Sequence, residues 1–198
     1  MPRSQPAEGR AGLKIAYLGW GSLVWDKRDL PIAGDWAKGG PVLPIEFSRI
    51  SNDGRLTLVI DEKHGGPVHV RYSRSASESL EDAVNRLWRR EGKPRRERIG
   101  FLNLSDDRED PSSRNHHPPA SDLIKVWAES NGWEAIVWTA LTNNFEEKSG
   151  EAYSAEAALK YLRDLPAEKR APAIEYINKA PEEVDTPFRR LFAQARLA

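Results

Sequence analysis

The most regular hydrophobic pattern in the chain lies between residues 79 and 91. Apolar side chains recur there every three or four positions, at Leu80, Ala83, Val84, Leu87 and Trp88. This spacing places them on one face of a helix. Ser79 can cap the first turn, Asp82 stands where a capping-box acid belongs, and Gly92 follows as a left-handed terminator. The pattern therefore predicts an amphipathic helix over residues 79–91.

Other apolar runs have the length and composition of strands. Residues 15–18 form a short continuous run, which is typical of a buried strand. Residues 44–51 and 55–60 flank the turn triplet Asn52-Asp53-Gly54, so they predict a β-hairpin. Two further strands are expected at residues 68–72 and 133–141.

The remaining pattern predicts helices joined by polar segments. Helices are expected at residues 121–131, at 155–165, and from about 171 to the end, interrupted by Pro181 and Pro187. Residues 27–43 are expected to be irregular, residues 103–122 to form a long polar loop, and residues 1–12 to be a flexible tail before one domain at 13–198. Strands and helices do not alternate regularly, which indicates an α+β fold.

The first strand ends in an unusual turn, Gly19-Trp20-Gly21-Ser22-Leu23. A dinucleotide-binding fingerprint would need glycine or alanine at Val24, and no Gly-Lys-Ser/Thr phosphate loop is present. A Gly-x-Ser-x-Gly nucleophile elbow does not fit either, because Trp20 and Val24 stand in place of its glycines. The adjacent pair His116-His117 lies in the polar loop, where histidines are usually solvated.

Two interpretations of this turn remain open. Successive amides of a tight glycine turn can point into one concavity and hold an anion, with the Ser22 hydroxyl as a further donor. Alternatively, the turn is a bulge that lets Trp20 and Trp25 pack in the core.

Glu91 extends the apolar stripe of the helix at 79–91. It stands three residues beyond Trp88 and four beyond Leu87, so its carboxylate is expected at the buried side of the last turn. Burial and the partial negative charge of a helix C-terminus both disfavour another anion, which suits a general base. The competing interpretation is that the last turn frays and Glu91 meets solvent or an arginine such as Arg95.

Composition narrows the classes of function. The chain has 30 Lys and Arg residues against 30 Asp and Glu residues, so no net charge favours nucleic acid or a membrane surface. It contains no cysteine, which excludes disulfides, thiolate catalysis and cysteine-based zinc sites. Together with the polar N-terminus, this predicts a soluble cytoplasmic protein that binds neither nucleic acid nor membrane.

The glycine turn and Glu91 together resemble the γ-glutamylcyclotransferase superfamily. The string Leu-Gly-Trp-Gly-Ser-Leu-Val-Trp at 18–25 is similar to the Gly-Tyr-Gly-Ser-Leu-Ile-Trp string of its glutathione-degrading ChaC branch. Looser similarity runs through residues 54–61 and 68–72 to Leu-Trp-Arg-Arg-Glu-Gly at 87–92, and the likeness spans roughly residues 14–195. Trp20, His69 and Trp88 depart from the residues usual in the family.

The resemblance implies a fold, a reaction and a site. The expected fold is a mixed β-sheet or small barrel flanked by helices. The expected reaction converts the γ-glutamyl group of a small compound, such as glutathione, to 5-oxoproline with release of the amine. It implies Glu91 as the catalytic base, substrate binding by Gly19, Trp20, Gly21, Ser22 and Leu23, and neither a metal nor an organic cofactor.

Two other classes of function compete with this enzyme. The same scaffold could bind a small ligand without turnover, with tryptophans lining the cavity, although most of the seven lie in apolar patterns typical of core residues. A nucleic-acid protein would use the basic residues Arg86, Arg89, Arg90, Arg95, Arg96 and Arg98. Acids are interleaved among them, which is typical of a solvated helix face.

Overall fold

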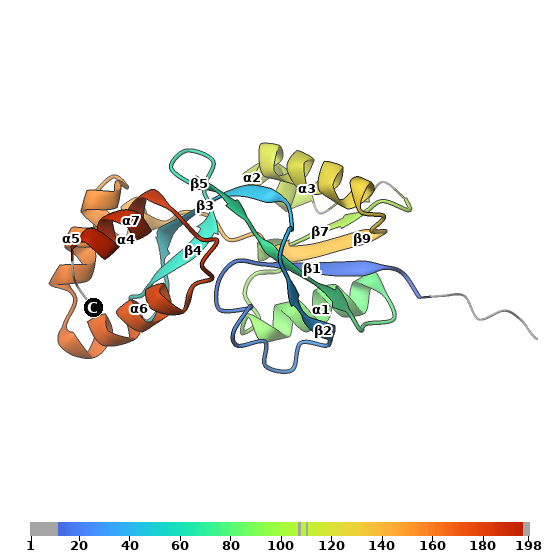
Figure 1. Ribbon diagram of the computed structural model, residues 1–198, viewed down its shortest axis with the longest axis horizontal. Helices are drawn as coiled ribbons and strands as arrows, with labels where there is room; N and C mark the ends of the chain where they lie inside the picture. The colour runs from blue at the N-terminus through green and yellow to red at the C-terminus, as the bar shows by residue number, and fades with distance from the viewer. Residues whose placement is uncertain (1–11, 107, 110, 196–198) are drawn as a thin grey trace, which may run out of the picture.

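The computed structural model describes residues 12–106, 108–109 and 111–195 (Figure 1). In chain order the strands are β1 (Ile15–Gly19), β2 (Ile32–Ala37), β3 (Val42–Ile50), β4 (Leu56–Ile60), β5 (Gly66–His69), β6 (Arg71–Ser75), β7 (Ile99–Asn103), β8 (Arg108–Glu109) and β9 (Ala135–Thr139). The helices are α1 (Leu80–Arg90), the 3₁₀ turn η1 (Arg96–Arg98), α2 (Pro111–His116), α3 (Pro118–Ser130), α4 (Phe145–Ser149), α5 (Ala155–Asp164), α6 (Ala167–Lys179) and α7 (Pro187–Gln194).

A six-stranded sheet in the order β2-β6-β1-β9-β7-β8 forms one half of the molecule. Its central strands β1 and β9 pair in parallel and are covered on both faces, by α1 below and α3 above in Figure 1. Ile15 and Tyr17 pack in the cluster that contains α1, whereas Ala16 and Leu18 pack in the cluster that contains α3. Burial of both faces explains why the sequences of these strands are continuous apolar runs.

A three-stranded sheet in the order β4-β3-β5 carries the C-terminal helices, at the left of Figure 1. The two sheets are linked because β2 runs on toward β3 and β5 runs on into β6. Hydrogen bonds from Gly40 N to Val70 O (3.0 Å) and from Val70 N to Pro41 O (3.1 Å) hold the two crossings together. On the helical side, Phe47 of β3 packs against Tyr176 of α6 and Phe188 of α7.

This architecture confirms the α+β prediction. Neither sheet closes on itself within the described ranges, so the small barrel allowed by the sequence analysis is not observed. Within the same ranges, no helix combines the length and the apolar character needed to span a bilayer. The predicted tail lies almost wholly outside the described residues, which begin at Gly12.

Several local predictions are confirmed by the backbone. Ser79 caps α1, where its Oγ accepts a 3.2 Å hydrogen bond from Asp82 N, and Gly92 follows the helix with φ +79°. The hairpin at β3 and β4, the strand at β9 and the helix at α5 lie where the pattern placed them. The strand expected at residues 68–72 is split at Val70 between β5 and β6, where the chain passes from one sheet to the other.

Two segments are more regular than predicted. Residues 27–43 contain β2, whose pairing with β6 supplies a partner that local composition does not reveal. The supposed loop at 103–122 contains β8, α2 and the start of α3. Pro111 begins α2 and Pro118 begins α3, positions at which proline favours a helix because its missing N–H needs no partner. His117 is buried rather than solvated.

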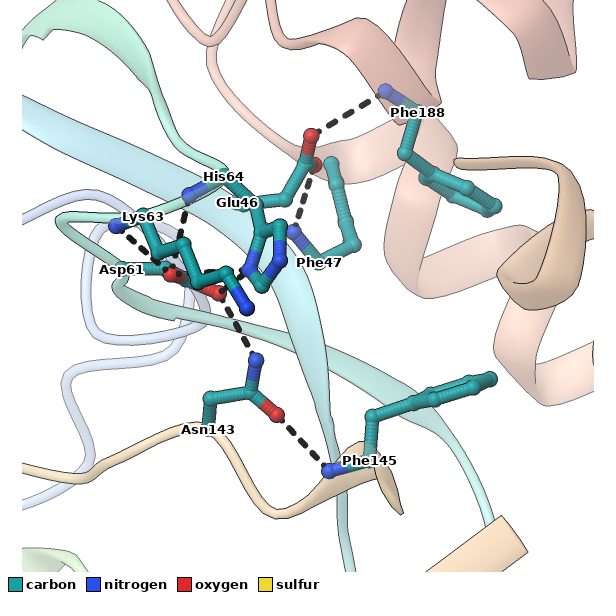
Figure 2. Close-up of polar contacts among 8 residues, drawn as sticks. All are labelled: Glu46, Phe47, Asp61, Lys63, His64, Asn143, Phe145 and Phe188. Carbon is teal, nitrogen blue, oxygen red and sulfur yellow. Dashed lines mark hydrogen bonds and ion pairs between the residues drawn. The ribbon is translucent and has the colours of Figure 1, made fainter. Parts of the chain in front are cut away.

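A buried polar cluster joins β3 to the C-terminal helices, and Figure 2 shows its contacts. Glu46 is fully buried, and its two carboxylate oxygens accept hydrogen bonds from the backbone amides of Phe47 (2.7 Å) and Phe188 (3.2 Å). Burial raises the pKa of Glu46, although the Thr186 side chain and these two amides act in the opposite direction. The carboxylate therefore fastens the first turn of α7 to the sheet.

Asp61 organises the neighbouring turn. Its carboxylate accepts hydrogen bonds from the backbone amides of Lys63 and His64 (both 3.1 Å), from His64 Nδ1 (3.2 Å) and from Asn143 Nδ2 (2.8 Å) (Figure 2). Burial acts to raise the pKa of Asp61, but the neighbouring side chains of Ser48, His64 and Asn143 outweigh it and hold the pKa below its usual value. Asp61 therefore fixes the turn that contains Lys63 and His64 and joins it to Asn143.

We expect Glu46→Gln to change how the free energy of unfolding depends on pH. Folding raises the pKa of Glu46, so the wild type gains stability from this group below about pH 4.5 and loses it as the pH rises through the folded-state value. Glutamine does not titrate, so the stability of the wild type relative to the variant should fall as the pH rises above about 4.5, measured by urea unfolding. Glu168→Gln, at an exposed site, is the control. A difference that does not vary with pH would contradict the assignment.

Candidate active site

A cavity of about 260 Å³ opens where β1, β9 and α1 end against the β3–β4 hairpin and α6. The sequence-predicted residues Gly19, Trp20, Gly21, Ser22, Leu23 and Glu91 all line it. The rest of its wall comes from Arg28, Arg49, Ser51, Arg55, Thr57, Leu58, Arg90, Thr139, Leu141 and Tyr176. The fold thus brings together the glycine turn and the glutamate, which are far apart in the sequence.

The glycines of the turn are needed because other side chains approach them closely. A Cβ atom on Gly19 would lie 2.9 Å from Trp36, and one on Gly21 would lie 2.6 Å from the Tyr176 hydroxyl. Both distances are shorter than Cβ contacts in real proteins, so neither site has room for a side chain. The structure thus identifies Trp36 and Tyr176 as the side chains that approach this backbone.

Both interpretations of the glycine turn find support. Trp20 is buried and its Nε1 donates to Leu58 O (3.4 Å), so the turn does let this ring pack in the core. The turn is closed by hydrogen bonds from Val24 N to Gly21 O (2.9 Å) and from Asp26 N to Ser22 O (2.8 Å). Among the described residues, the amides of Gly21 and Leu23 donate to no protein acceptor. They are therefore available to an anion in the cavity that they line.

Arg90 connects the turn to the glutamate. Its Nη1 donates to Glu91 Oε1 (2.6 Å), its Nη2 donates to Ser22 Oγ (3.3 Å), and its Nε donates to Asp26 O (3.1 Å). Nη2 also contacts Asp26 O. One guanidinium therefore holds the carboxylate and the serine hydroxyl beside each other, and its planar array of donors suits this task.

The position of Arg90 corrects the sequence analysis, which placed it on the solvated face of the helix. The side chain of Arg90 is only 5% exposed. Arg90 stands three residues beyond Leu87, so the spacing that pointed to Glu91 applied equally to Arg90. A charged side chain is expected at the surface. Inside the protein, however, Asp26 O, Ser22 Oγ and the Glu91 carboxylate accept hydrogen bonds from the Arg90 guanidinium.

Glu91 is the C-cap residue of α1, and its side chain is 18% exposed. The last turn does not fray, since Glu91 N donates to Leu87 O (2.9 Å). The arginine partner of its carboxylate is Arg90 rather than Arg95. Oε2 has no protein donor among the described residues, so this oxygen remains available to a ligand.

Tyr176 is a cavity residue that the sequence analysis missed. Its hydroxyl accepts a long hydrogen bond from Leu58 N (3.5 Å), and its ring packs edge-on against Trp25 at 5.2 Å. Burial raises the pKa of Tyr176 to about 12, with a further contribution from the charge of Glu91, while the amides of Leu58 and Ser22 act in the opposite direction. The phenol is therefore protonated at neutral pH. No local motif around residue 176 marks it, because only the docking of α6 brings it here.

Other residues singled out in the sequence lie elsewhere. Of the three departures from the family pattern, only Trp20 lines the cavity. His69 is exposed on β5, with Nδ1 3.4 Å from Gly40 O, and Trp88 Nε1 donates to Pro94 O (2.7 Å) outside the cavity wall. His116 and His117 lie at the junction of α2 and α3.

No family model, curated protein or solved structure matches this chain.

We expect Gly21→Ala to destabilise the protein by roughly 1–3 kcal/mol, because its methyl group would collide with the Tyr176 hydroxyl. Tyr176→Phe removes the hydroxyl oxygen with which this methyl group would collide. The double variant should therefore be more stable than the sum of the two single changes predicts, as measured by urea unfolding of all four proteins. Gly12→Ala, where the nearest atom lies 3.9 Å away, is the control and should be neutral. Additive effects would show that Tyr176 does not occupy this position.

Proposed function

We propose that this protein is a γ-glutamylcyclotransferase-like enzyme that releases 5-oxoproline from a small γ-glutamyl compound. The observation that carries the proposal is that the Glu91 carboxylate and the Gly19–Leu23 turn line one cavity. These are the two features on which the sequence resemblance rests. The proposal includes the fold, with the two linked sheets as an open variant of the γ-glutamylcyclotransferase-like architecture.

In the proposed reaction the nucleophile and the electrophile belong to one molecule. The α-amine of the γ-glutamyl group attacks its own γ-carbonyl carbon, a new C–N bond closes the five-membered ring, and the original amide C–N bond breaks. The cavity accelerates this step mainly by holding the substrate in a folded pose. No oxidant, reductant or second substrate enters the balance.

Glu91 is assigned the proton transfers. Its free Oε2 would take a proton from the substrate ammonium so that the amine can attack, and would return it to the nitrogen of the leaving amine. Arg90 acts as a positioning residue, because its 2.6 Å bond to Oε1 holds the carboxylate toward the cavity.

The cavity wall opposite Glu91 is assigned to binding the negatively charged groups of the substrate. The free amides of Gly21 and Leu23, with the Ser22 hydroxyl, can bind the α-carboxylate or the oxyanion that forms at the γ-carbon. The protonated Tyr176 hydroxyl lies against the same turn and is a further donor. The substrate would thus sit between the main-chain donors and the glutamate, in a cytoplasmic setting compatible with the chain's composition.

We expect Glu91→Gln to lower 5-oxoproline release by at least about 10²-fold, since the amide can neither accept nor return the proton. Release is measured from glutathione and from a panel of γ-glutamyl dipeptides and amines, with unfolding curves to establish that the variant is folded. Glu81→Gln, on the exposed face of the same helix, is the matched control and should leave release unchanged. Full activity in Glu91→Gln would remove Glu91 from this role.

The same experiment tests the alternative of a non-catalytic binding module. If γ-glutamyl compounds bind to the wild type and no 5-oxoproline forms, the cavity is a binding site without turnover. The Arg90–Glu91 ion pair is the feature that favours this alternative, because it engages one oxygen of Glu91, whose carboxylate is the only one in the cavity wall among the described residues.

A further inference from the structure

A second cavity, of about 370 Å³, lies beside the first. The two share the wall residues Arg49, Ser51, Glu91, Thr139 and Leu141. The second is completed by Asn52, Gly92, Lys93, Pro94, Arg98 and Ile99, from the β3–β4 hairpin and the segment after α1. Glu91 therefore stands at the junction, with the glycine turn on one side only.

The second cavity has cations without counter-ions. Arg49, Lys93 and Arg98 line it, and none has a carboxylate oxygen within 4.0 Å among the residues that the structure describes. The other arginines of the first cavity differ, because Arg28 pairs with Asp26 (3.4 Å) and Arg55 with Asp53 (2.8 Å). Glu91 is the carboxylate in the second wall, and Arg90 already holds it.

Arg49 and Arg98 lie close enough to repel each other. Burial lowers the pKa of Arg49, and the charge of Arg98 lowers it further, while Glu147 acts more weakly in the opposite direction. Arg49 is also fixed in place, since its Nη1 donates to Thr142 O (2.8 Å). Two guanidiniums held near each other in a cavity are costly in isolation, and an anion between them removes that cost.

We propose that the second cavity receives the leaving amine of the substrate and that this amine carries two acid groups. The inference rests on the proposed function, which places the scissile amide at Glu91, where the cavities meet. With the γ-glutamyl group in the first cavity, the leaving group must extend into the second. A single carboxylate would match one of the arginines, whereas two acid groups match both. The preferred substrate class is thus a γ-glutamyl conjugate of an acidic amino acid or of a phosphorylated amino acid.

The test compares substrates that differ in charge. γ-Glutamylglutamate and γ-glutamylglutamine have nearly the same shape and differ by one acid group, and γ-glutamyl-O-phosphoserine and γ-glutamylserine differ by a phosphate. We expect kcat/KM for 5-oxoproline release to be at least about tenfold higher for the more acidic member of one pair, since hydrogen bonds between charged groups are worth about that factor. The pair with the larger ratio distinguishes a carboxylate from a phosphate ligand.

Arg98→Gln should reduce that ratio toward one, because it removes a cation from the second cavity and leaves the first intact. Arg95→Gln removes a charge at an exposed position that lines neither cavity, so it should leave the ratio unchanged. Unfolding curves establish that both variants are folded. Either of two results would overturn the inference: a kcat/KM ratio near one in the wild type, or the same ratio in Arg98→Gln as in the wild type. Neither result would contradict the proposed cyclisation reaction.

Binding separates failure of the inference from failure of the proposed function. The dissociation constants of the same four peptides for Glu91→Gln, measured by calorimetry, should show the same preference without turnover. If no peptide yields 5-oxoproline with the wild type, the proposed function fails, and the binding ratio alone then decides whether the second cavity selects acidic ligands. Equal binding of both members of each pair counts against the inference in either case.

Discussion

The buried guanidinium of Arg90 is the interaction on which the candidate site depends. It bonds to the carboxylate of Glu91, to the hydroxyl of Ser22 and to the main-chain oxygen of Asp26, and so joins the end of α1 to the turn after β1. Arg28 Nη1 in turn donates to Arg90 O (3.1 Å), which satisfies a carbonyl at the end of the helix. Without this network, a buried arginine and a partly buried glutamate would each lack a partner, which is costly inside a protein.

The charge of the molecule is balanced only as a whole. Equal numbers of acidic and basic residues give no net charge, yet the two cavities are lined by Arg28, Arg49, Arg55, Arg90, Arg98 and Lys93 against a single carboxylate. Arg28 and Arg55 pair with Asp26 and Asp53, which lie outside the two cavity walls, whereas Arg49, Arg98 and Lys93 pair with no carboxylate among the described residues. A zero total therefore says nothing about the local charge, which is positive along the cavity walls where a small anion could enter.

Sequence reasoning worked where one segment carried its own signal. The periodic stripe of α1, its serine cap and its terminal glycine predicted the helix, and the same stripe pointed to Glu91. It failed where the deciding contact came from another segment: β2 needs β6 as its partner, Tyr176 reaches Gly21 only when α6 docks, and Arg90 is buried because Ser22 and Asp26 satisfy it. The helices of residues 103–122 were missed for a different reason, because two prolines that begin helices were read as loop residues.

The contact between Tyr176 and Gly21 has a consequence for how the site comes into being. A chain that ended before α6 would contain the whole glycine turn, α1 and Glu91, and could form the paired strands around β1. It would still lack one wall of the cavity, because that wall arrives with a helix near the end of the chain. During synthesis, therefore, the complete cavity can form only after α6 has been made and has docked.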